Sequence, residues 1–386
     1  AVDPAWKIED HAESVKSGKT LKDIAADAKA PQWRSSRAAE PAKKRAAARK
    51  LEPLPEVASP MLATPVDAAF DDDEWVFELK WDGYRALTTI DREGHISIAS
   101  RSGKDFTPNF PEFADLAAAF RERPLIVDGE IVVLDAQGHS SFGALQERLD
   151  RFGRSAPAKS PATLVVFDLL YGNGRDLRDE PLEARKAALE SLLTGKGPVM
   201  FSKHVRKDGK DLYELAESQG LEGIVGKRRA SKYVSRRSAD WVKVKAVVRQ
   251  EVAIGGWTEA RGSRKHFGAL LAGVYEGGEF VYAGSIGTGF DEKKLAAIAA
   301  KLAPLERKTS PFASRPKTET PAHWVAPSLV AEVTFTEWTR DGSMRHPVFV
   351  ALRVDKDPHD IVRERAKSAK SVVAASGKAK KAKVSV

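Results

Sequence analysis

Short runs of β-forming residues follow one another through the middle of the chain and constrain its fold more than any other feature. Gly, Asp or Pro bounds each run, and the runs lie at residues 75–81, 96–100, 124–135, 162–171, 222–228 and 240–248. Helical stretches lie between them, at residues 110–120, 182–193 and 208–218. Strands interspersed with helices in this way predict an α+β body.

A second block of strand-like sequence follows this body. It contains three β-forming runs and one helical stretch, at residues 252–260, 268–286, 329–339 and 291–302. Short strands separated by glycines, with a single helix, predict a small β-barrel. We therefore expect two domains, at residues 51–247 and 248–362.

Both ends of the chain have a composition that does not favour a packed core. Residues 30–50 consist largely of Ala, Lys, Arg, Ser and Pro, and the last residues of Ala, Lys, Ser and Val. Such segments bury too little apolar surface to offset the entropy lost on ordering. We predict a largely flexible linker at residues 1–50 and a basic flexible tail at residues 363–386. A solvated tail is the simpler interpretation of the latter, ahead of a dedicated nucleic-acid arm.

The charge of the chain indicates the kind of partner it binds, and its lack of cysteine indicates the compartment in which it works. The 386 residues carry 63 Lys and Arg against 54 Asp and Glu, a formal net charge of +9. This excess favours a polyanionic partner, because basic side chains that bind phosphates release counterions. With no Cys, the chain can form neither disulfides nor a cysteine-ligated zinc site. No apolar run approaches the roughly 18 residues that cross a membrane. We expect a cytoplasmic protein that makes no membrane contact.

Charged residues share a face in three of the predicted strands, because residues two apart in a strand point the same way. These sets are Glu78 with Lys80, Asp128 with Glu130, and Trp241 with Lys243 and Lys245. A single such set is typical of an ordinary solvent-facing strand. Three sets in one predicted domain favour a common functional site.

An ordered series of motifs resembles the covalent nucleotidyltransferase superfamily, which contains DNA ligases, RNA ligases and mRNA capping enzymes. The first motif is Lys-Trp-Asp-Gly-Tyr-Arg at residues 80–85, a KxDGxR sequence. The others follow in the family order at residues 100–103, 128–130, 165–168, 222–225, 241–245 and 345–356. A lone KxDG arises by chance, whereas the complete ordered set is specific.

Within this superfamily, the chain most resembles the ATP-dependent DNA ligase domain of bacterial ligase D, from Ku-dependent non-homologous end joining. The runs at residues 262–275 and 346–356 carry that likeness, and residues 14–28 resemble the segment that leaves the phosphoesterase module of such proteins. The resemblance implies a nucleotidyltransferase (ATP-grasp-like) domain of antiparallel sheets with flanking helices, followed by an OB-fold. It implies an enzyme that uses ATP and Mg²⁺ (or Mn²⁺) to seal 5′-phosphate and 3′-hydroxyl ends. Its implied partners are nicked or broken double-stranded DNA, Ku, and polymerase and phosphoesterase modules, in a bacterial cytoplasm near the nucleoid.

The resemblance makes Lys80 the nucleophile, which attacks the α-phosphate of ATP to form a lysyl-AMP intermediate. An amine attacks only in its neutral form, and an ordinary lysine is protonated at neutral pH. We expect the cationic neighbours Lys243 and Lys245, together with a bound metal, to disfavour the protonated form of Lys80.

The resemblance also implies roles for the other motif residues. Nucleotide contacts fall to Glu78, Arg85, Arg101, Glu130, Phe167, Lys243 and Lys245. Metal binding falls to Glu130 and Glu222. Contacts to the nick phosphate or to the leaving pyrophosphate fall to Arg237, Arg345, Arg353, Asp355 and Lys356. The sequence leaves two points open: Phe167 suits a plain core position equally well, and either Arg236 or Arg237 could be the functional basic residue.

Other functions remain compatible with the sequence at this point. An RNA ligase or a capping enzyme would use the same Lys80 chemistry. A non-catalytic DNA-binding scaffold would use the basic barrel and the chain ends. Carboxylates such as Glu130 and Glu222 speak against the scaffold, because they repel DNA phosphates unless a metal lies between them.

Overall fold

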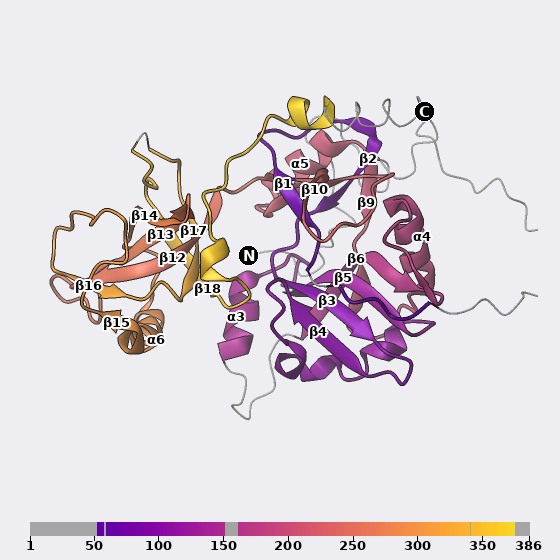
Figure 1. The fold of residues 1–386 in the computed structure, drawn as a ribbon, viewed down its shortest axis with the longest axis horizontal. Coiled ribbons are helices and arrows are strands. Elements are labelled where there is room, and N and C mark those ends of the chain that lie inside the picture. Colours follow the sequence, from indigo (N-terminus) through magenta and orange to yellow (C-terminus); the bar gives the residue numbers. More distant parts are fainter. Residues whose placement is uncertain (1–51, 58, 151–160, 340, 375–386) are drawn as a thin grey trace, which may run out of the picture.

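The computed structural model describes residues 52–57, 59–150, 161–339 and 341–374. The predicted linker at residues 1–50 and the predicted tail from residue 375 onward lie outside these described residues. Figure 1 shows a larger body built from the first two thirds of the chain and a smaller barrel, drawn in orange and yellow, beside it. This confirms the expected α+β body followed by a β-barrel.

Two sheets form the larger body. The first has the order β1-β11-β10-β2-β9, with bounds Leu62–Pro65, Arg237–Lys245, Gly223–Arg228, Asp72–Leu79 and His204–Lys207. The second has the order β4-β3-β5-β6-β7 with β8 beside β6, and its bounds are Ile96–Ser100, Tyr84–Ile90, Leu125–Val133, Ala162–Gly172, Arg175–Asp176 and Val199–Phe201. Neighbouring strands run antiparallel except in the pairs β1–β11 and β6–β8.

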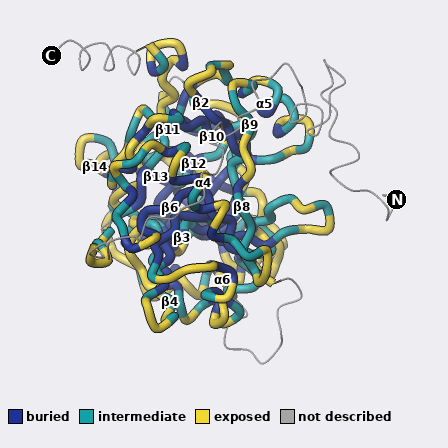
Figure 2. Tube along the Cα trace, turned by 90° about the vertical axis from the view of Figure 1, so that its right-hand side faces the viewer, coloured by how far each residue is buried: buried dark blue, intermediate teal, exposed yellow. Residues whose placement is uncertain are grey.

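Burial explains why these runs form strands. In β2, Trp75 and Phe77 are fully buried and pack with Val242 and Val244 of β11. The opposite faces of β2 and β11 carry the charged sets that the sequence predicted. Figure 2 shows both sheets as a buried interior under an exposed surface of loops.

Among the described residues, the helices α3 (Phe142–Asp150), α4 (Leu182–Leu192) and α5 (Gly209–Ser218) belong to this body. The helix predicted at residues 110–120 is wrong. Three 3₁₀ turns stand in this region, at Thr107–Asn109, Pro111–Phe113 and Leu116–Ala119. The buried residues of this region, Phe110, Phe113, Leu116 and Ala119, recur at every third position, which is the period of a 3₁₀-helix and not that of an α-helix. No helix among the described residues is long and apolar enough to span a membrane.

The barrel contains seven strands and one longer helix among the described residues. The strands β12 to β18 are Arg249–Thr258, Leu270–Glu276, Glu279–Ile286, Glu306–Arg307, Ala322–Val325, Val330–Thr334 and Val348–Arg353. The helix α6 spans Glu292–Leu302 and packs Leu295, Ile298 and Leu302 into the barrel core.

The chain then returns to the larger body, which the prediction of a free tail from residue 363 did not anticipate. Lys367 pairs with Val66 beside β1, and residues 369–374 are helical. Ala369 and Val372 are buried in the same cluster as Trp75 and Phe77. Figure 1 shows this yellow segment crossing from the barrel to the sheet of β1 and β2. The apolar side chains near the chain end therefore dock on an existing core, so this part is not the free tail that composition suggested.

Candidate active site

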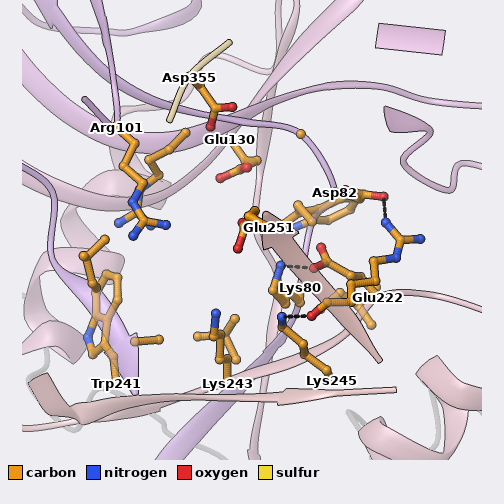
Figure 3. A pocket seen from close by; sticks show the side chains of 18 of the residues that line it. Lys80, Asp82, Arg101, Glu130, Glu222, Trp241, Lys243, Lys245, Glu251 and Asp355 are labelled. Atoms are coloured by element: carbon orange, nitrogen blue, oxygen red, sulfur yellow. Dashed lines mark hydrogen bonds and ion pairs between the residues drawn. The ribbon is translucent and has the colours of Figure 1, made fainter. Parts of the chain in front are cut away.

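A pocket lies between the larger body and the barrel, and we call it the interdomain pocket. In the larger body its walls come from β2 and the turn after it, and from β3, β5, β6, β10 and β11. In the barrel they come from β12, β17, β18 and the segment that follows β18. Every predicted site residue lines it except Arg345. Figure 3 shows Lys243 and Lys245 pointing into the pocket from one side, with Glu251 and Asp355 on the other.

Sheet register brings three motifs into one row. Val225 of β10 pairs with Glu78 of β2 on one side and with Lys243 of β11 on the other. Lys80 follows β2 directly, and its backbone N–H donates to the carbonyl of Gly223 at 2.9 Å. The shared face predicted for Trp241, Lys243 and Lys245 is confirmed, because all three line the pocket.

Lys80 is paired with a carboxylate in the structure. Its Nζ contacts Oε1 of Glu222, and the pair is largely buried. Attraction to Glu222 outweighs burial and raises the pKa of Lys80 above its ordinary value, with Asp82 and Glu130 adding to the effect. The expectation that Lys243 and Lys245 lower this pKa therefore does not hold in the structure. Of the carboxylates around Lys80, only Asp82 is its neighbour in the sequence, whereas Glu130 and Glu222 come from distant segments.

Lys243 and Lys245 are held by a residue from outside every predicted motif. Glu364, in the segment after the barrel, contacts Nζ of Lys243 at 2.5 Å and Nζ of Lys245 at 2.7 Å. Burial and the neighbouring Lys245 lower the pKa of Lys243 to about 8 in spite of this contact. Two buried ammonium groups side by side form a strong site for an anion.

Two other carboxylates in the pocket have raised pKa values. Burial raises the pKa of Glu130 to about 7. Burial, followed by repulsion from Glu222 and Glu332, raises that of Asp82 to about 6. Among the residues that the structure describes, no hydrogen bond or ion pair engages the Glu130 carboxylate, whereas Asp82 accepts one from Arg249 at 2.7 Å. Crowded carboxylates of this kind are stabilised by a cation or by ligand donors.

This donor set fits a hard divalent metal. Carboxylate oxygens are the ligands that Mg²⁺ and Mn²⁺ prefer, and Glu130 offers oxygens that no described residue engages. Glu222 is the second predicted ligand, and its carboxylate also borders the pocket. The chemistry of these side chains is thus consistent with a metal that binds together with a polyphosphate.

Glu78 and Phe167 line the inner part of the pocket. Oε1 of Glu78 accepts from Lys186 at 2.9 Å and lies 3.0 Å from Nζ of Lys227, while Oε2 accepts from Ser202 at 2.7 Å. The two lysines hold the pKa of Glu78 at about 2 despite its burial. Phe167 belongs to a buried apolar cluster and also borders the pocket, so it combines the two positions that the sequence left open.

Arg85 positions Phe167 rather than standing free. Its Nε and Nη2 donate to both oxygens of Asp128, at 2.5 and 2.6 Å. Its guanidinium lies 4.7 Å from the centre of the Phe167 ring. Asp128 also accepts from Tyr233 at 2.6 Å. Asp128 and Glu130, which the sequence analysis grouped together, therefore have different roles. Asp128 fixes Arg85 in the interior, and Glu130 faces the pocket.

The barrel supplies a second set of charges. Arg353 donates to Glu332 at 2.8 Å and to both oxygens of Asp355 at 2.9 Å. Lys356 pairs with Glu251 at 3.2 Å. Arg353 also donates to the carbonyl of Gly83 in the turn after Lys80, at 3.2 Å. The barrel is therefore closed over the pocket, and its charges meet those of the larger body.

The basic residues outside these networks differ in position. Arg237 lines the pocket and donates to the carbonyl of Ala63, whereas Arg236 is exposed and does not line it. Arg101 lines the pocket without a hydrogen bond or ion pair to any described residue. Arg345 is not brought to the pocket. It pairs with Glu337 on the barrel surface, and its side chain is 54% exposed.

Sequence reasoning missed several residues at the site, namely Lys227, Arg249, Glu251 and Glu332 in the wall of the pocket and Glu364 in the adjoining cavity. The alternation of side chains along a strand could have identified Lys227 and Glu251. Lys227 lies two residues after Val225 in β10, and Glu251 lies two residues after Arg249 in β12. The other three reach the site only because the barrel closes over it, and no local sequence pattern predicts this closure.

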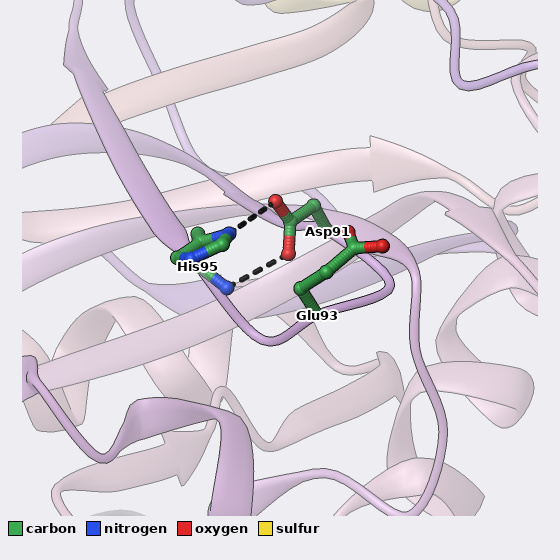
Figure 4. A group of neighbouring side chains, drawn as sticks. All are labelled: Asp91, Glu93 and His95. Carbon is green, nitrogen blue, oxygen red and sulfur yellow. Dashed lines mark hydrogen bonds and ion pairs between the residues drawn. The ribbon is translucent and has the colours of Figure 1, made fainter.

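A separate cluster of possible metal ligands lies on the turn between β3 and β4. Asp91, Glu93 and His95 bring their ligand atoms within 4.8 Å of one another (Figure 4). Asp91 already accepts from the His95 ring at 2.8 Å and from the backbone N–H groups of Gly94 and His95. These contacts are those of a surface turn, and we assign no metal to it.

Comparison with known proteins agrees with this geometry. The model of the ATP dependent DNA ligase domain matches residues 60–245, and that of the ATP dependent DNA ligase C terminal region matches residues 263–356. The multifunctional non-homologous end joining protein LigD of Pseudomonas aeruginosa is 40% identical over 365 residues, 93% of this chain and 42% of that protein. The corresponding LigD of Mycobacterium tuberculosis is 39% identical over 315 residues, 79% of this chain and 40% of that protein. The chain thus spans less than half the length of these relatives.

A solved structure supports the same conclusion. The mycobacterial DNA ligase D complexed with ATP and MES is 36% identical, with a TM-score of 0.59. The match covers 80% of this chain and 98% of that one. The likeness therefore extends over both the larger body and the barrel, including the strands that form the interdomain pocket. The chain belongs to the family of ATP-dependent DNA ligases.

Proposed function

We propose that the chain seals 5′-phosphate and 3′-hydroxyl ends of double-stranded DNA through a lysyl-AMP intermediate on Lys80. The observation that carries this proposal is the placement of Lys80 within a pocket that contains a buried lysine pair and partly unpaired carboxylates. In the first step, Nζ of Lys80 attacks the α-phosphorus of ATP. The P–N bond forms, the bond to the bridging oxygen of the β-phosphate breaks, and pyrophosphate leaves.

The pocket residues suit this step. Lys243 and Lys245 bind and stabilise the negative charge that develops on the α-phosphate. Lys80 has to lose its proton before it attacks, and Glu222, whose carboxylate contacts Nζ, is placed to accept it. Phe167 is placed to stack on the base, and Glu78, whose carboxylate is already engaged by Lys186, Lys227 and Ser202, would meet the base through its backbone.

A divalent metal, Mg²⁺ or Mn²⁺, is part of the proposal. Glu130 and Glu222 would hold it, and its charge would favour the neutral form of Lys80 and offset that of the phosphates. The side chains of Arg353, Asp355 and Lys356 approach the pocket from the barrel, where they would orient the leaving pyrophosphate. Arg101 and Arg237 would contact the nucleotide or the 5′-phosphate of the nick. Arg345 would take part only in an arrangement other than the one described.

The DNA step requires a different arrangement of the two domains. In the closed structure, Arg353 contacts the turn after Lys80, so the barrel covers the nucleophile. It has to open before a nick can reach the adenylate. The relatives named as end-joining proteins support a role in double-strand break repair. We therefore propose Ku, and polymerase and phosphoesterase modules, as partners in the bacterial cytoplasm.

The test is incubation with α-labelled ATP and Mg²⁺, followed by a denaturing gel. Label should remain on the wild-type chain and on Lys210→Ala, which removes a largely exposed lysine of α5. Label should be absent from Lys80→Ala. Equal label on Lys80→Ala would contradict the assignment of the nucleophile. Supplying nicked duplex DNA should then release the label as AMP with a sealed strand, whereas sealing of nicked RNA alone would overturn the choice of substrate.

A further inference from the structure

We propose that residues 362–374, here called the C-terminal strap, form an autoinhibitory device in which Glu364 occupies the phosphate-binding site of Lys243 and Lys245. This inference concerns regulation of the same pocket and rests on the proposed function. In this proposal the strap, which lies outside the ligase motifs, competes with the triphosphate of ATP.

The contacts of Glu364 resemble those of a bound phosphate. One carboxylate oxygen lies 2.5 Å from Nζ of Lys243 and the other lies 2.7 Å from Nζ of Lys245. The side chain of Glu364 is 20% exposed, and those of Lys243 and Lys245 are 15% and 18% exposed. Both lysines line the interdomain pocket, and Glu364 reaches them from the adjoining cavity. An incoming phosphate oxygen has to take the same place.

The strap is anchored to the barrel on either side of Glu364. Gln250 of β12 accepts from the backbone N–H of Glu364 at 3.1 Å and donates to the carbonyl of Val362 at 3.1 Å. Arg363 pairs with Glu276 at 2.9 Å, and its guanidinium lies 4.4 Å from the Trp338 ring. The backbone around Glu364 is thus fixed by four different barrel contacts, so the carboxylate is aimed at the lysines by the barrel.

The far end of the strap is anchored to the larger body. The N–H of Lys367 donates to the carbonyl of Pro65 at 3.0 Å, and its carbonyl accepts from Asp67 at 3.0 Å. The N–H of Ala369 donates to the Asp67 side chain at 2.9 Å. Val372 is only 5% exposed. A segment attached to both domains opposes their separation, so the strap also favours the closed arrangement.

Electrostatics requires the strap to yield when ATP binds. Glu364 and the triphosphate are both anions, and Lys243 and Lys245 cannot be saturated by both at once. Glu251 lies in the same cavity as Glu364 and adds repulsion, while Arg237 and Arg101 border the cavity and add attraction for an anion. If the strap covers the site most of the time, the apparent dissociation constant of ATP rises by the inverse of the uncovered fraction.

The first experiment measures binding by calorimetry, with Mg-ATP and with inorganic tripolyphosphate, on Glu364→Gln. The substitution keeps the size of the side chain and removes its charge. We expect the apparent Kd for both ligands to fall roughly tenfold, as for a site that is about 90% covered. Glu306→Gln, at an exposed position on β15, is the control and should bind as the wild type does. Unchanged or weaker binding by Glu364→Gln would overturn the proposal.

The second experiment tests the anchor. Val372→Asp places a charge in the buried end of the strap and should also tighten ATP binding, with the full chain still folded by circular dichroism. In the wild type, hydrogen exchange at the Lys367 and Ala369 amides should accelerate when Mg-ATP is added. Unchanged exchange together with full ATP binding would overturn the proposal, even if Val372→Asp does not fold.

These outcomes are separate from those of the proposed function. Loss of the lysyl-AMP label on every variant would contradict the ligase chemistry, whereas the strap is decided by binding and exchange. Absence of any phosphate binding by Glu364→Gln would contradict the strap as well, because that variant frees both lysines.

Discussion

Glu78 on β2 and Lys80 directly after that strand stand two residues apart, yet the charge clusters around them differ in construction. The Glu78 cluster consists of Glu78, Lys186, Lys227 and Ser202, all at most 3% exposed and all from the larger body. The Lys80 cluster consists of Lys80, Glu222, Asp82 and Glu130, and it is joined to the barrel by the ion pair of Asp82 with Arg249. The side chain of Lys80 itself is 21% exposed. In the first cluster, Lys186, Lys227 and Ser202 engage both oxygens of the carboxylate. In the second, burial raises the pKa values of Asp82 and Glu130, and repulsion from Glu222 and Glu332 adds to the effect at Asp82.

The difference shows which charges hold the fold and which are available to a ligand. A saturated cluster inside one domain gains nothing from a ligand and loses much if a member is removed. A cluster shared between domains can exchange its internal partners for phosphates and a metal. The following predictions, in order of falling effect, test this division.

Removal of Glu78 should cause the largest loss of stability. Glu78→Ala leaves the buried ammonium groups of Lys186 and Lys227 without their carboxylate, which costs about 3–5 kcal/mol. We expect the Tm of the larger body to fall by about 10 °C. Differential scanning calorimetry measures this, with the exposed Glu190→Ala of α4 as the control. A Tm within about 2 °C of the wild type would contradict the view that the Glu78 cluster stabilises the fold.

Removal of Lys243 should affect chemistry more than stability. Lys243→Met should lower the rate of lysyl-AMP formation about 10²–10³-fold, because one of two groups that stabilise the α-phosphate charge is lost. Its Tm should stay close to that of the wild type, since the pair with Glu364 is formed between domains. Quenched-flow labelling gives the rate, and Lys301→Met on α6 serves as the matched variant. A large fall in Tm with an unchanged rate would assign Lys243 to the structural cluster instead.

Glu130 should make the stability of the free protein depend on pH. Its folded pKa is about 7 against an ordinary 4.5, so its stabilising contribution is complete below pH 4.5 and is lost as the pH rises through 7. Glu130→Gln should therefore be more stable than the wild type by about 1–3 kcal/mol at pH 8, and the difference should vanish near pH 4. Urea unfolding at several pH values measures this. The same difference at all pH values would mean that Glu130 is not the titrating group.

The smallest effect is expected at Arg345. It forms an exposed pair with Glu337 on the barrel surface, and such pairs contribute little. Arg345→Ala should change the rate of lysyl-AMP formation by no more than about twofold, whereas Arg353→Ala, which disrupts the closed pocket, should slow it at least roughly tenfold. Equal losses would show that adenylation uses an arrangement in which Arg345 reaches the nucleotide.

Local patterns were sufficient to predict much of the fold and the site. Alternation placed Trp241, Lys243 and Lys245 on one face, and burial of Val242 and Val244 on the other enforces it. All of the site residues that the motifs indicated lie in the pocket, with the exception of Arg345. The helix predicted at residues 110–120 was wrong because the buried side chains there recur at every third position, from Phe110 to Ala119, as in a 3₁₀-helix.

The sequence by itself determined the strands, the faces on which their charges lie, and the membership in a ligase family, because each depends on residues close together in the chain. Only the tertiary structure decided how those charges are paired. Glu222 meets Lys80 across 142 positions, and Glu364 meets Lys243 across 121. The pKa of a buried group is set by the charges within a few ångströms of it, and these come from whatever segments the fold brings together. The raised pKa of Lys80 and the occupied lysine pair are therefore properties of the folded chain alone.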